Sequence, residues 1–229
     1  MVGTKEGVRV LWGAGTPRTM RAHWMLHELD LAYERRPIGS RTGETQTPEY
    51  TRLNPGQKIP VLQDGDFVLS ESAAIVNYLA QSYGASRNLL LPANTRERAR
   101  YDEWCYFAMM ELDADTLYVI RRHEGLPELY GKAPNAVKAA TDCFRKQAQA
   151  AAQRLASAGP FVLGERFSGA DVLLTTCLTG AVRNRIELPD VLQKYMERCT
   201  ARDAYRLAEA ANRGNQSSIA PAKSLHRNR

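Results

Sequence analysis

The stretch from Asn54 to Tyr83 constrains the fold more than any other part of the sequence. Two short β-type runs, Pro60 to Gln63 and Asp66 to Leu69, are separated by Asp64-Gly65. This pair is typical of a tight hairpin because glycine tolerates the positive φ that such turns need. Residues 72–83 then place apolar side chains on one face at helical spacing. The stretch therefore predicts a β-hairpin followed at once by a helix.

Two features of this stretch indicate a ligand. Pro60 lacks the donor that a strand needs, and a cis bond before it would leave the backbone N–H and C=O of Ile59 as a free pairing edge. The helix that begins at residues 70–72 offers unpaired N–H groups to an anion, with Glu71 beside them to hold a cation. An extended peptide with an α-amino acid head would fit both. Gly84 stands where a left-handed residue would end the helix.

The order of these motifs resembles the glutathione-binding half of the cytosolic glutathione transferases, in their bacterial-type, Ser/Thr-activated branch. The family's Lys-Val-Pro before the hairpin and Glu-Ser at the helix start correspond to Lys58, Ile59, Pro60, Glu71 and Ser72. The resemblance implies that Ile59 pairs with the cysteine of glutathione and that Pro60 is cis. It also implies that Glu71 and Ser72 hold the γ-glutamyl head, while Lys58 faces the glycine carboxylate. The alternative is a thioredoxin-like hairpin without a ligand.

The net charge of +6 raises the question of nucleic-acid binding. Much of the excess lies in the last stretch, where Arg213, Lys223, Arg227 and Arg229 have no acid among them. A solvated basic tail explains this better than a groove for phosphates, so we expect no nucleic-acid partner.

The four cysteines form no metal or redox pattern, which favours a reduced, cytoplasmic protein. The sequence has no run of about twenty apolar residues to span a bilayer, and its start lacks the features of an export signal. We therefore expect no membrane association.

The order of predicted elements is that of an α/β thioredoxin-like domain, βαβαββα, followed by an all-helical domain. A strand at 8–12, a helix at 18–29, a strand at 33–38 and a helix at 47–53 precede the hairpin. We expect the glutathione-binding domain at 1–84, a linker at 85–93, the helical domain at 94–213 and a basic tail at 214–229.

One motif in the helical domain is predicted to be structural. Ser168 and Asp171 stand in the relation of a capping box, which stabilises a helix start by about 1 kcal/mol. The same motif opens the central helix of the helical domain in the family that the chain resembles.

The chemistry is expected between the first strand and the first helix, where Thr16-Pro17-Arg18-Thr19 occupies the positions of a redox Cys-x-x-Cys. A threonine hydroxyl at a helix start can assist a thiol that the ligand brings in. The family pattern Ser-Pro-x-x-x-Arg points to Thr16 as the catalytic hydroxyl, with Thr in place of Ser. Thr19 is the second candidate, and a pure capping role for Thr16 is the alternative.

Further candidates concern a second substrate and a metal. Trp12, Tyr106, Met109 and Met110 are candidates for the second-substrate pocket, because methionine suits an adaptable surface. Core packing explains such residues more often than contact with a ligand does. His23 and His27 have a spacing that can bind metal, but no third ligand is in view, so we expect no metal.

The sequence therefore predicts a glutathione transferase in which the glutathione thiolate attacks a small apolar electrophile. The resemblance implies a homodimer. Two alternatives stay open: an isomerase, peroxidase or dehalogenase that uses glutathione as a returning cofactor, and a binding or regulatory protein without catalysis.

Overall fold

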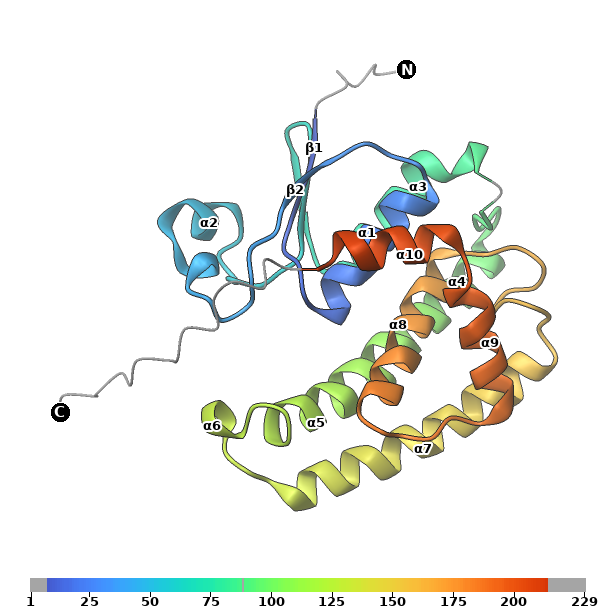
Figure 1. The fold of residues 1–229 in the computed structure, drawn as a ribbon. Coiled ribbons are helices and arrows are strands. Elements are labelled where there is room, and N and C mark those ends of the chain that lie inside the picture. Colours follow the sequence, from blue (N-terminus) through green and yellow to red (C-terminus); the bar gives the residue numbers. More distant parts are fainter. Residues whose placement is uncertain (1–7, 88, 214–229) are drawn as a thin grey trace.

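A four-stranded mixed sheet forms the N-terminal part of the molecule (Figure 1). The computed structural model describes residues 8–87 and 89–213, so the predicted tail at 214–229 lies outside the described residues. The strands β1 (Arg9–Trp12), β2 (Glu34–Arg36), β3 (Val61–Asp64) and β4 (Phe67–Ser70) pair in the order β2-β1-β3-β4. β2 runs parallel to β1, while β3 and β4 are antiparallel neighbours. This confirms the predicted thioredoxin-like order.

Helices cover both faces of the sheet. α1 (Pro17–Glu28) and α3 (Ser72–Tyr83) pack on the face to which fully buried Leu11 belongs. α2 (Pro48–Leu53) covers the other face. Successive side chains of a strand point to opposite faces, so Trp12 joins this second, smaller cluster and meets Tyr50 edge to face.

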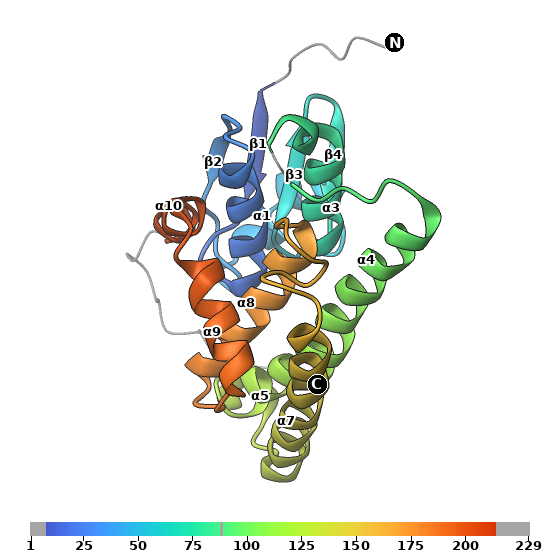
Figure 2. The same ribbon diagram turned by 90° about the vertical axis from the view of Figure 1, so that its right-hand side faces the viewer.

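The C-terminal part is helical, as predicted. Its long helices are α4 (Thr95–Phe107), α7 (Pro134–Ala156) and α8 (Gly169–Arg183). α8 is almost wholly buried and lies in the middle of this part, in contact with α1 and α4 (Figure 2). The shorter elements of this part are the π-helix η3 (Ala108–Leu117), α5 (Tyr118–His123), α6 (Pro127–Tyr130), α9 (Asp190–Thr200) and α10 (Asp203–Ala211). Two 3₁₀ turns lie earlier in the chain, η1 (Glu44–Gln46) before α2 and η2 (Gly84–Ser86) after α3.

Two local predictions differ from the structure. Gly84 does not adopt a left-handed conformation: its φ is −79°, because the chain continues into the 3₁₀ turn η2. The hairpin turn lies at Gly65-Asp66, one residue later than predicted, because Asp64 pairs with Phe67. In the helical part, the segment from α4 to α5 is continuous, and its middle third is the π-helix η3. Apolar periodicity does not distinguish a π-helical segment from an α-helix.

The predicted capping motif at the start of α8 is confirmed. The Asp171 carboxylate accepts hydrogen bonds from the backbone N–H and hydroxyl of Ser168, at 2.8 and 2.7 Å. It also accepts from the Val162 N–H and the Tyr195 hydroxyl. Burial raises the pKa of Asp171, and these donors act in the opposite direction. Asp171 thus fixes the start of α8 and also holds the segment around Val162 and the helix α9.

A buried arginine joins the two parts of the molecule. Arg21 on α1 is 1% exposed, and its Nη2 lies 2.7 Å from a carboxylate oxygen of Asp113 in η3. Its Nε donates to the Thr176 hydroxyl on α8 at 2.8 Å, and its Nη1 donates to the Ser72 hydroxyl on α3 at 3.1 Å. Arg18 also binds Asp113, but is more exposed. The Arg21 guanidinium on α1 therefore bonds to three other helices, η3, α8 and α3.

We expect Arg21→Met to lower the free energy of unfolding by about 3 kcal/mol, because it removes one partner of a buried ion pair and leaves two hydroxyls without their donor. Arg18→Met is the matched control, because it removes a half-exposed partner of the same carboxylate, and should cost about 1 kcal/mol or less. Urea denaturation measures both. Equal losses would contradict this account.

His23 on α1 is a buried neutral side chain. Its Nδ1 lies 2.7 Å from the Tyr33 hydroxyl and its Nε2 lies 3.2 Å from the Gly13 carbonyl oxygen. Because a carbonyl can only accept, the Nε2 carries the proton and the Nδ1 accepts from Tyr33. Burial lowers the pKa of His23 to about 4, with smaller contributions from the charges of Arg35 and His27. Both ring nitrogens of His23 are therefore occupied by partners within the protein.

Since the folded pKa of His23 lies below the unfolded value, the unfolded chain binds more protons between the two values, and stability falls as the pH drops through this window. The shift predicts a loss of about 2 kcal/mol between pH 7 and pH 5 from this group. Urea denaturation at the two pH values measures the loss. In His23→Gln the pH dependence should shrink by this amount, and an unchanged dependence would argue against it.

Candidate functional site

The loop between β1 and α1 lies against the loop before β3. Gly13 has φ +111°, and a Cβ there would come within 2.6 Å of the Ile59 Cβ and 2.9 Å of the Thr19 Cγ2. Only glycine combines this conformation with so close an approach. Gly13 therefore brings the threonine loop and the Ile59-Pro60 loop together, as the predicted site requires.

The Ile59-Pro60 loop has the expected geometry. The peptide bond between these residues is cis. The Lys58 carbonyl accepts from the Tyr50 hydroxyl at 2.7 Å and from the Asn54 amide at 2.8 Å, which fixes the loop. Within the described part of the chain, the Ile59 backbone N–H and C=O form no hydrogen bond. Ile59 thus presents a free backbone edge, while the Lys58 side chain is exposed.

The start of α3 places Glu71 and Ser72 in different environments. Glu71 is exposed and has φ +66°, a strained conformation for a residue with a side chain. Such strain is often found where a backbone is shaped for a ligand. Ser72 is 5% exposed, and its hydroxyl accepts from Arg21. The buried arginine therefore orients a predicted ligand residue.

The two threonines at the start of α1 form a reciprocal cap. The Thr16 hydroxyl accepts from the Thr19 N–H at 3.0 Å, and the Thr19 hydroxyl accepts from the Thr16 N–H at 3.0 Å. The two hydroxyl oxygens are themselves 3.0 Å apart. Thr19 is fully buried, whereas Thr16 is 7% exposed.

A residue that the sequence analysis did not anticipate completes this loop. Asn212 follows α10, and its Oδ1 lies 2.6 Å from the Thr19 hydroxyl and 3.2 Å from the Gly15 N–H. Its Nδ2 donates to the Thr16 carbonyl at 3.1 Å, so its amide orientation is fixed by two backbone partners. The Asn212 carbonyl accepts a further bond from the Gly15 N–H at 2.7 Å. No sequence motif marks a contact between residues so far apart.

Asn212 distinguishes the two threonines. The Thr19 hydroxyl has one proton to donate. It contacts Asn212 Oδ1 and, at 2.9 Å, the Thr16 carbonyl oxygen, and both of these atoms can only accept a hydrogen bond. That proton is therefore used inside the protein. Among the residues that the structure describes, the Thr16 hydroxyl has only the Thr19 oxygen as an acceptor, so it can turn its proton to a ligand.

The four candidates for the second pocket lie in three different places. Met109 in η3 is half-buried, and its sulfur lies 3.2 Å from Arg21 Nη1. Tyr106 and Met110 are exposed, at 68% and 54%. Trp12 belongs to the cluster under α2 with Ile59, and its Nε1 donates to Gln63 at 2.6 Å. A role for these residues in a pocket stays a prediction.

Protein thiols and metal ligands are not gathered at the site. Cys105, Cys177 and Cys199 are buried, and burial raises the pKa of each thiol to about 12. Within residues 8–87 and 89–213, no group of three His, Cys, Asp or Glu side chains is placed to hold a metal ion. In the same ranges, no helix is long and apolar enough to cross a membrane.

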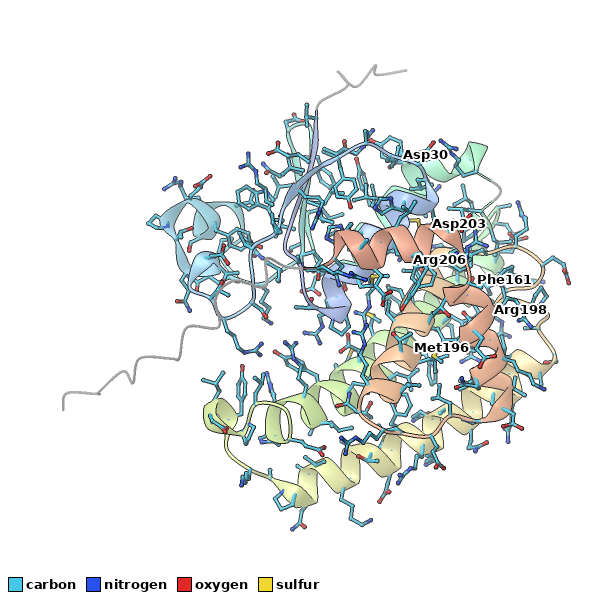
Figure 3. The ribbon with its side chains drawn as sticks, in the orientation of Figure 1. Asp30, Phe161, Met196, Arg198, Asp203 and Arg206 are labelled. Atoms are coloured by element: carbon cyan, nitrogen blue, oxygen red, sulfur yellow. The ribbon has the colours of Figure 1, made fainter. Side chains whose placement is uncertain are left out.

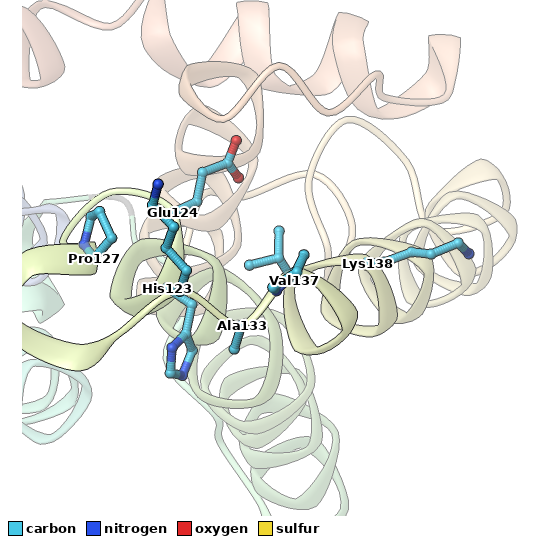
Figure 4. Close-up of a pocket in the computed structure, with 8 residues that line it drawn as sticks. His123, Glu124, Pro127, Ala133, Val137 and Lys138 are labelled. Carbon is cyan, nitrogen blue, oxygen red and sulfur yellow. The ribbon is translucent and has the colours of Figure 1, made fainter.

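A separate hollow of about 450 Å³ lies between α5, α6 and the start of α7 (Figure 4). Pro127, Ala133 and Val137 contribute apolar surface, and His123 and Lys138 contribute polar groups. None of the residues predicted to bind glutathione lines it. We therefore place the functional site at the threonine loop, where the chemistry-bearing groups converge.

The comparisons with known proteins concern the family and the fold. Residues 7–81 match the model of the glutathione S-transferase N-terminal domain. A theta class glutathione S-transferase from Xanthomonas axonopodis pv. citri, solved with glutathione bound, is 30% identical and has a TM-score of 0.77. The alignment covers 87% of this chain and 95% of that chain. The fold is a thioredoxin-like domain followed by a helical part, and the chain belongs to the cytosolic glutathione S-transferase family.

Curated relatives match over a shorter length. The glutathione S-transferase-like protein gedE of Aspergillus terreus is 34% identical over 99 residues, 42% of this chain and 43% of its own. Glutathione S-transferase theta-1 of Bos taurus is 32% identical over 102 residues, 44% of this chain and 42% of its own. The chain thus aligns with less than half the length of these two relatives.

We expect Asn212→Ala to lower the free energy of unfolding by about 1–2 kcal/mol, because it removes side-chain hydrogen bonds to the threonine loop. The adjacent Arg213→Ala is the control: its side chain is exposed, and the bond from Arg35 reaches only its backbone carbonyl. Chemical denaturation compares the two. If Asn212→Ala is as stable as Arg213→Ala, the Asn212 side chain does not stabilise the threonine loop.

Proposed function

We propose that this protein is a glutathione transferase in which the Thr16 hydroxyl stabilises the glutathione thiolate for attack on an electrophilic carbon. The proton assignment in the threonine loop carries this proposal. Thr16 lies at the start of α1, and its proton is available to a ligand, whereas that of Thr19 is not. The relative from Xanthomonas axonopodis pv. citri, with its bound glutathione, supports the choice of ligand.

The peptide would lie along the edge formed by Ile59 and the start of α3. The free backbone groups of Ile59 would pair with the cysteine of glutathione, as one strand pairs with another. The first N–H groups of α3 and the Ser72 hydroxyl would bind the α-carboxylate of the γ-glutamyl head, and Glu71 would bind its ammonium group. Lys58 would face the glycine carboxylate.

The task of Thr16 is energetically modest. A free cysteine thiol titrates near 8.5, so stabilising its anion by one to two pKa units requires about 1.4 to 2.7 kcal/mol. One hydrogen bond to a charged acceptor contributes roughly 1.5 to 3 kcal/mol, and the helix start adds about 0.3 to 1 kcal/mol. The Thr16 hydroxyl can accept from the Thr19 N–H and donate to sulfur at the same time. Capping and catalysis are therefore compatible at this residue.

What happens to glutathione after thiolate formation distinguishes a transferase from the alternative functions. A transferase consumes glutathione, whereas an isomerase returns it and a binding or regulatory protein does no chemistry. A homodimer is part of the proposal as the assembly expected of the family.

Thiolate absorbance of bound glutathione, recorded as a function of pH, tests the role of Thr16. We expect a thiol pKa below the free value in the wild type and in Thr16→Ser, and a return toward the free value in Thr16→Val. Thr19→Val is the matched control and should keep the low pKa. Loss of the cap should cost about 1 kcal/mol of stability in Thr16→Val.

Calorimetric titration with S-methylglutathione, which has no ionisable thiol, shows whether each variant still binds the peptide. A low thiol pKa in Thr16→Val with intact binding would remove Thr16 from the mechanism. Absence of glutathione binding at millimolar concentration in the wild type would overturn the proposed function itself.

A further inference from the structure

Four arginines and two tyrosines gather where the threonine loop faces the helical part. We name them the arginine–tyrosine cluster: Arg18, Arg41, Tyr118, Arg121, Arg122 and Tyr130. Arg18 lies in the first turn of α1, directly after Pro17, and Arg41 lies in the loop between β2 and η1. The others belong to α5 and to α6, the helices below that loop in Figure 1. The cluster is therefore contributed by both parts of the molecule.

Cation–π contacts hold together all members of the cluster except Arg121, which precedes Arg122 on α5. The guanidinium groups of Arg18 and Arg122 each lie 4.3 Å from the centre of the Tyr118 ring. Arg122 also lies 5.4 Å from the centre of the Tyr130 ring. Arg41 approaches the same ring at 5.7 Å and donates to its hydroxyl at 3.2 Å. Aromatic faces attract cations at these distances, but they do not neutralise the charge.

The positive charge of the cluster is not balanced by nearby acids. Arg18 binds Asp113, which also binds Arg21. For Arg41, Arg121 and Arg122, no carboxylate of the described residues lies within 4.0 Å. The Nε of Arg122 is buried and has no hydrogen-bond partner among the described residues. A buried unpaired donor costs free energy that an acceptor from a ligand would recover.

Two pKa directions agree with an excess of positive charge. Burial, together with the charges of Arg41 and Arg18, lowers the pKa of Arg121. Burial alone would raise the pKa of Tyr118, yet this pKa lies below its ordinary value because of Arg122, Arg18 and Arg41. An anion placed among these side chains would be stabilised by the same field.

The loop that carries Arg41 is pre-arranged. Arg41 has φ +72°, a conformation that is unfavourable for a residue with a side chain. The Glu44 carboxylate accepts from the Gly39 N–H at 2.9 Å and from the Thr42 hydroxyl at 2.6 Å, which closes the loop around this strained residue. The strain is thus maintained by specific bonds, as is common at ligand-binding positions.

We infer that the arginine–tyrosine cluster binds an acidic group of the second substrate, so that the preferred electrophile is a flat aromatic or conjugated molecule that carries a carboxylate. Guanidinium groups match the two oxygens of a carboxylate, and the tyrosine rings offer surface for stacking. This inference rests on the proposed function and replaces the expected apolar electrophile with an anionic one.

A binding experiment tests the inference without any reaction. Calorimetric titration of the full chain with 3,5-dinitrobenzoate and with 3,5-dinitrobenzamide compares two ligands of nearly equal shape that differ in charge. We expect the carboxylate to bind at least about tenfold more tightly. The double variant Arg41→Gln/Arg121→Gln should reduce the preference to about twofold or less, and added salt should weaken it. Equal binding of the two ligands, or no binding of the carboxylate, overturns the inference.

Arg206→Gln is the control for a general change in surface charge. Arg206 lies on α10 (Figure 3) and pairs with Asp203 at 3.3 Å, outside the cluster. It should leave the preference unchanged. Affinity for S-methylglutathione should also stay within about twofold in the double variant. A loss confined to S-methylglutathione would place Arg41 and Arg121 in the peptide site and overturn the inference.

Turnover then links the cluster to the reaction, with 4-chloro-3,5-dinitrobenzoate and the corresponding benzamide as electrophiles. The glutathione sulfur forms a bond to the ring carbon that carries chlorine, chloride leaves with the electron pair of the broken bond, and the thiol proton passes to the buffer. We expect kcat/KM, relative to the uncatalysed rate, to favour the carboxylate in the wild type and Arg206→Gln, but not in the double variant. If neither electrophile reacts, the proposed function fails, and the binding preference still decides the inference.

Discussion

Arg21 carries a charge in the interior of this protein, and much of the architecture is arranged to accommodate it. An unpaired buried charge is too costly to keep, so the guanidinium requires Asp113 and the hydroxyls of Ser72 and Thr176 at fixed positions. These partners come from η3, α3 and α8. The position of the helical part relative to the sheet is therefore tied to the same contact that orients Ser72, a predicted ligand residue.

Asp113 lies in the π-helix η3, and this location connects the buried ion pair to the surface of the site. π-Helical segments often occur where a helix must place a side chain that regular geometry would direct elsewhere. Asp113 binds Arg21 on its buried side and Arg18 on its more exposed side. Although burial would raise the pKa of Asp113, the two arginines lower it, so the carboxylate stays charged at neutral pH. The Asp113 carboxylate is therefore a common partner of Arg21, which joins the two parts of the molecule, and of Arg18 in the arginine–tyrosine cluster.

The sequence was sufficient for features with a local cause. The Ser168–Asp171 cap and the Thr16-Pro17 helix start each depend on residues a few positions apart, and the structure shows both. The predicted hairpin is present too, but its turn is Gly65-Asp66, one residue later than predicted, because Asp64 still pairs with Phe67. Asn212 and the arginine–tyrosine cluster could not be predicted, because they depend on contacts between distant segments with no characteristic spacing. At Gly84 a local signal was misleading. Glycine favours a left-handed residue at the end of a helix, but here the chain continues into the turn η2, which does not require that conformation.

The bond between Gly15 and Asn212 joins residues 197 positions apart in the chain. During synthesis, the strands and helices that build the thioredoxin-like part leave the ribosome long before Asn212 does. The hydroxyl of Thr19 acquires Asn212 Oδ1 as an acceptor only when α10 has folded back onto α1. The order of translation thus makes the threonine loop one of the last parts of the molecule to be completed, and a nascent chain with a finished sheet still lacks the contacts that join this loop to Asn212.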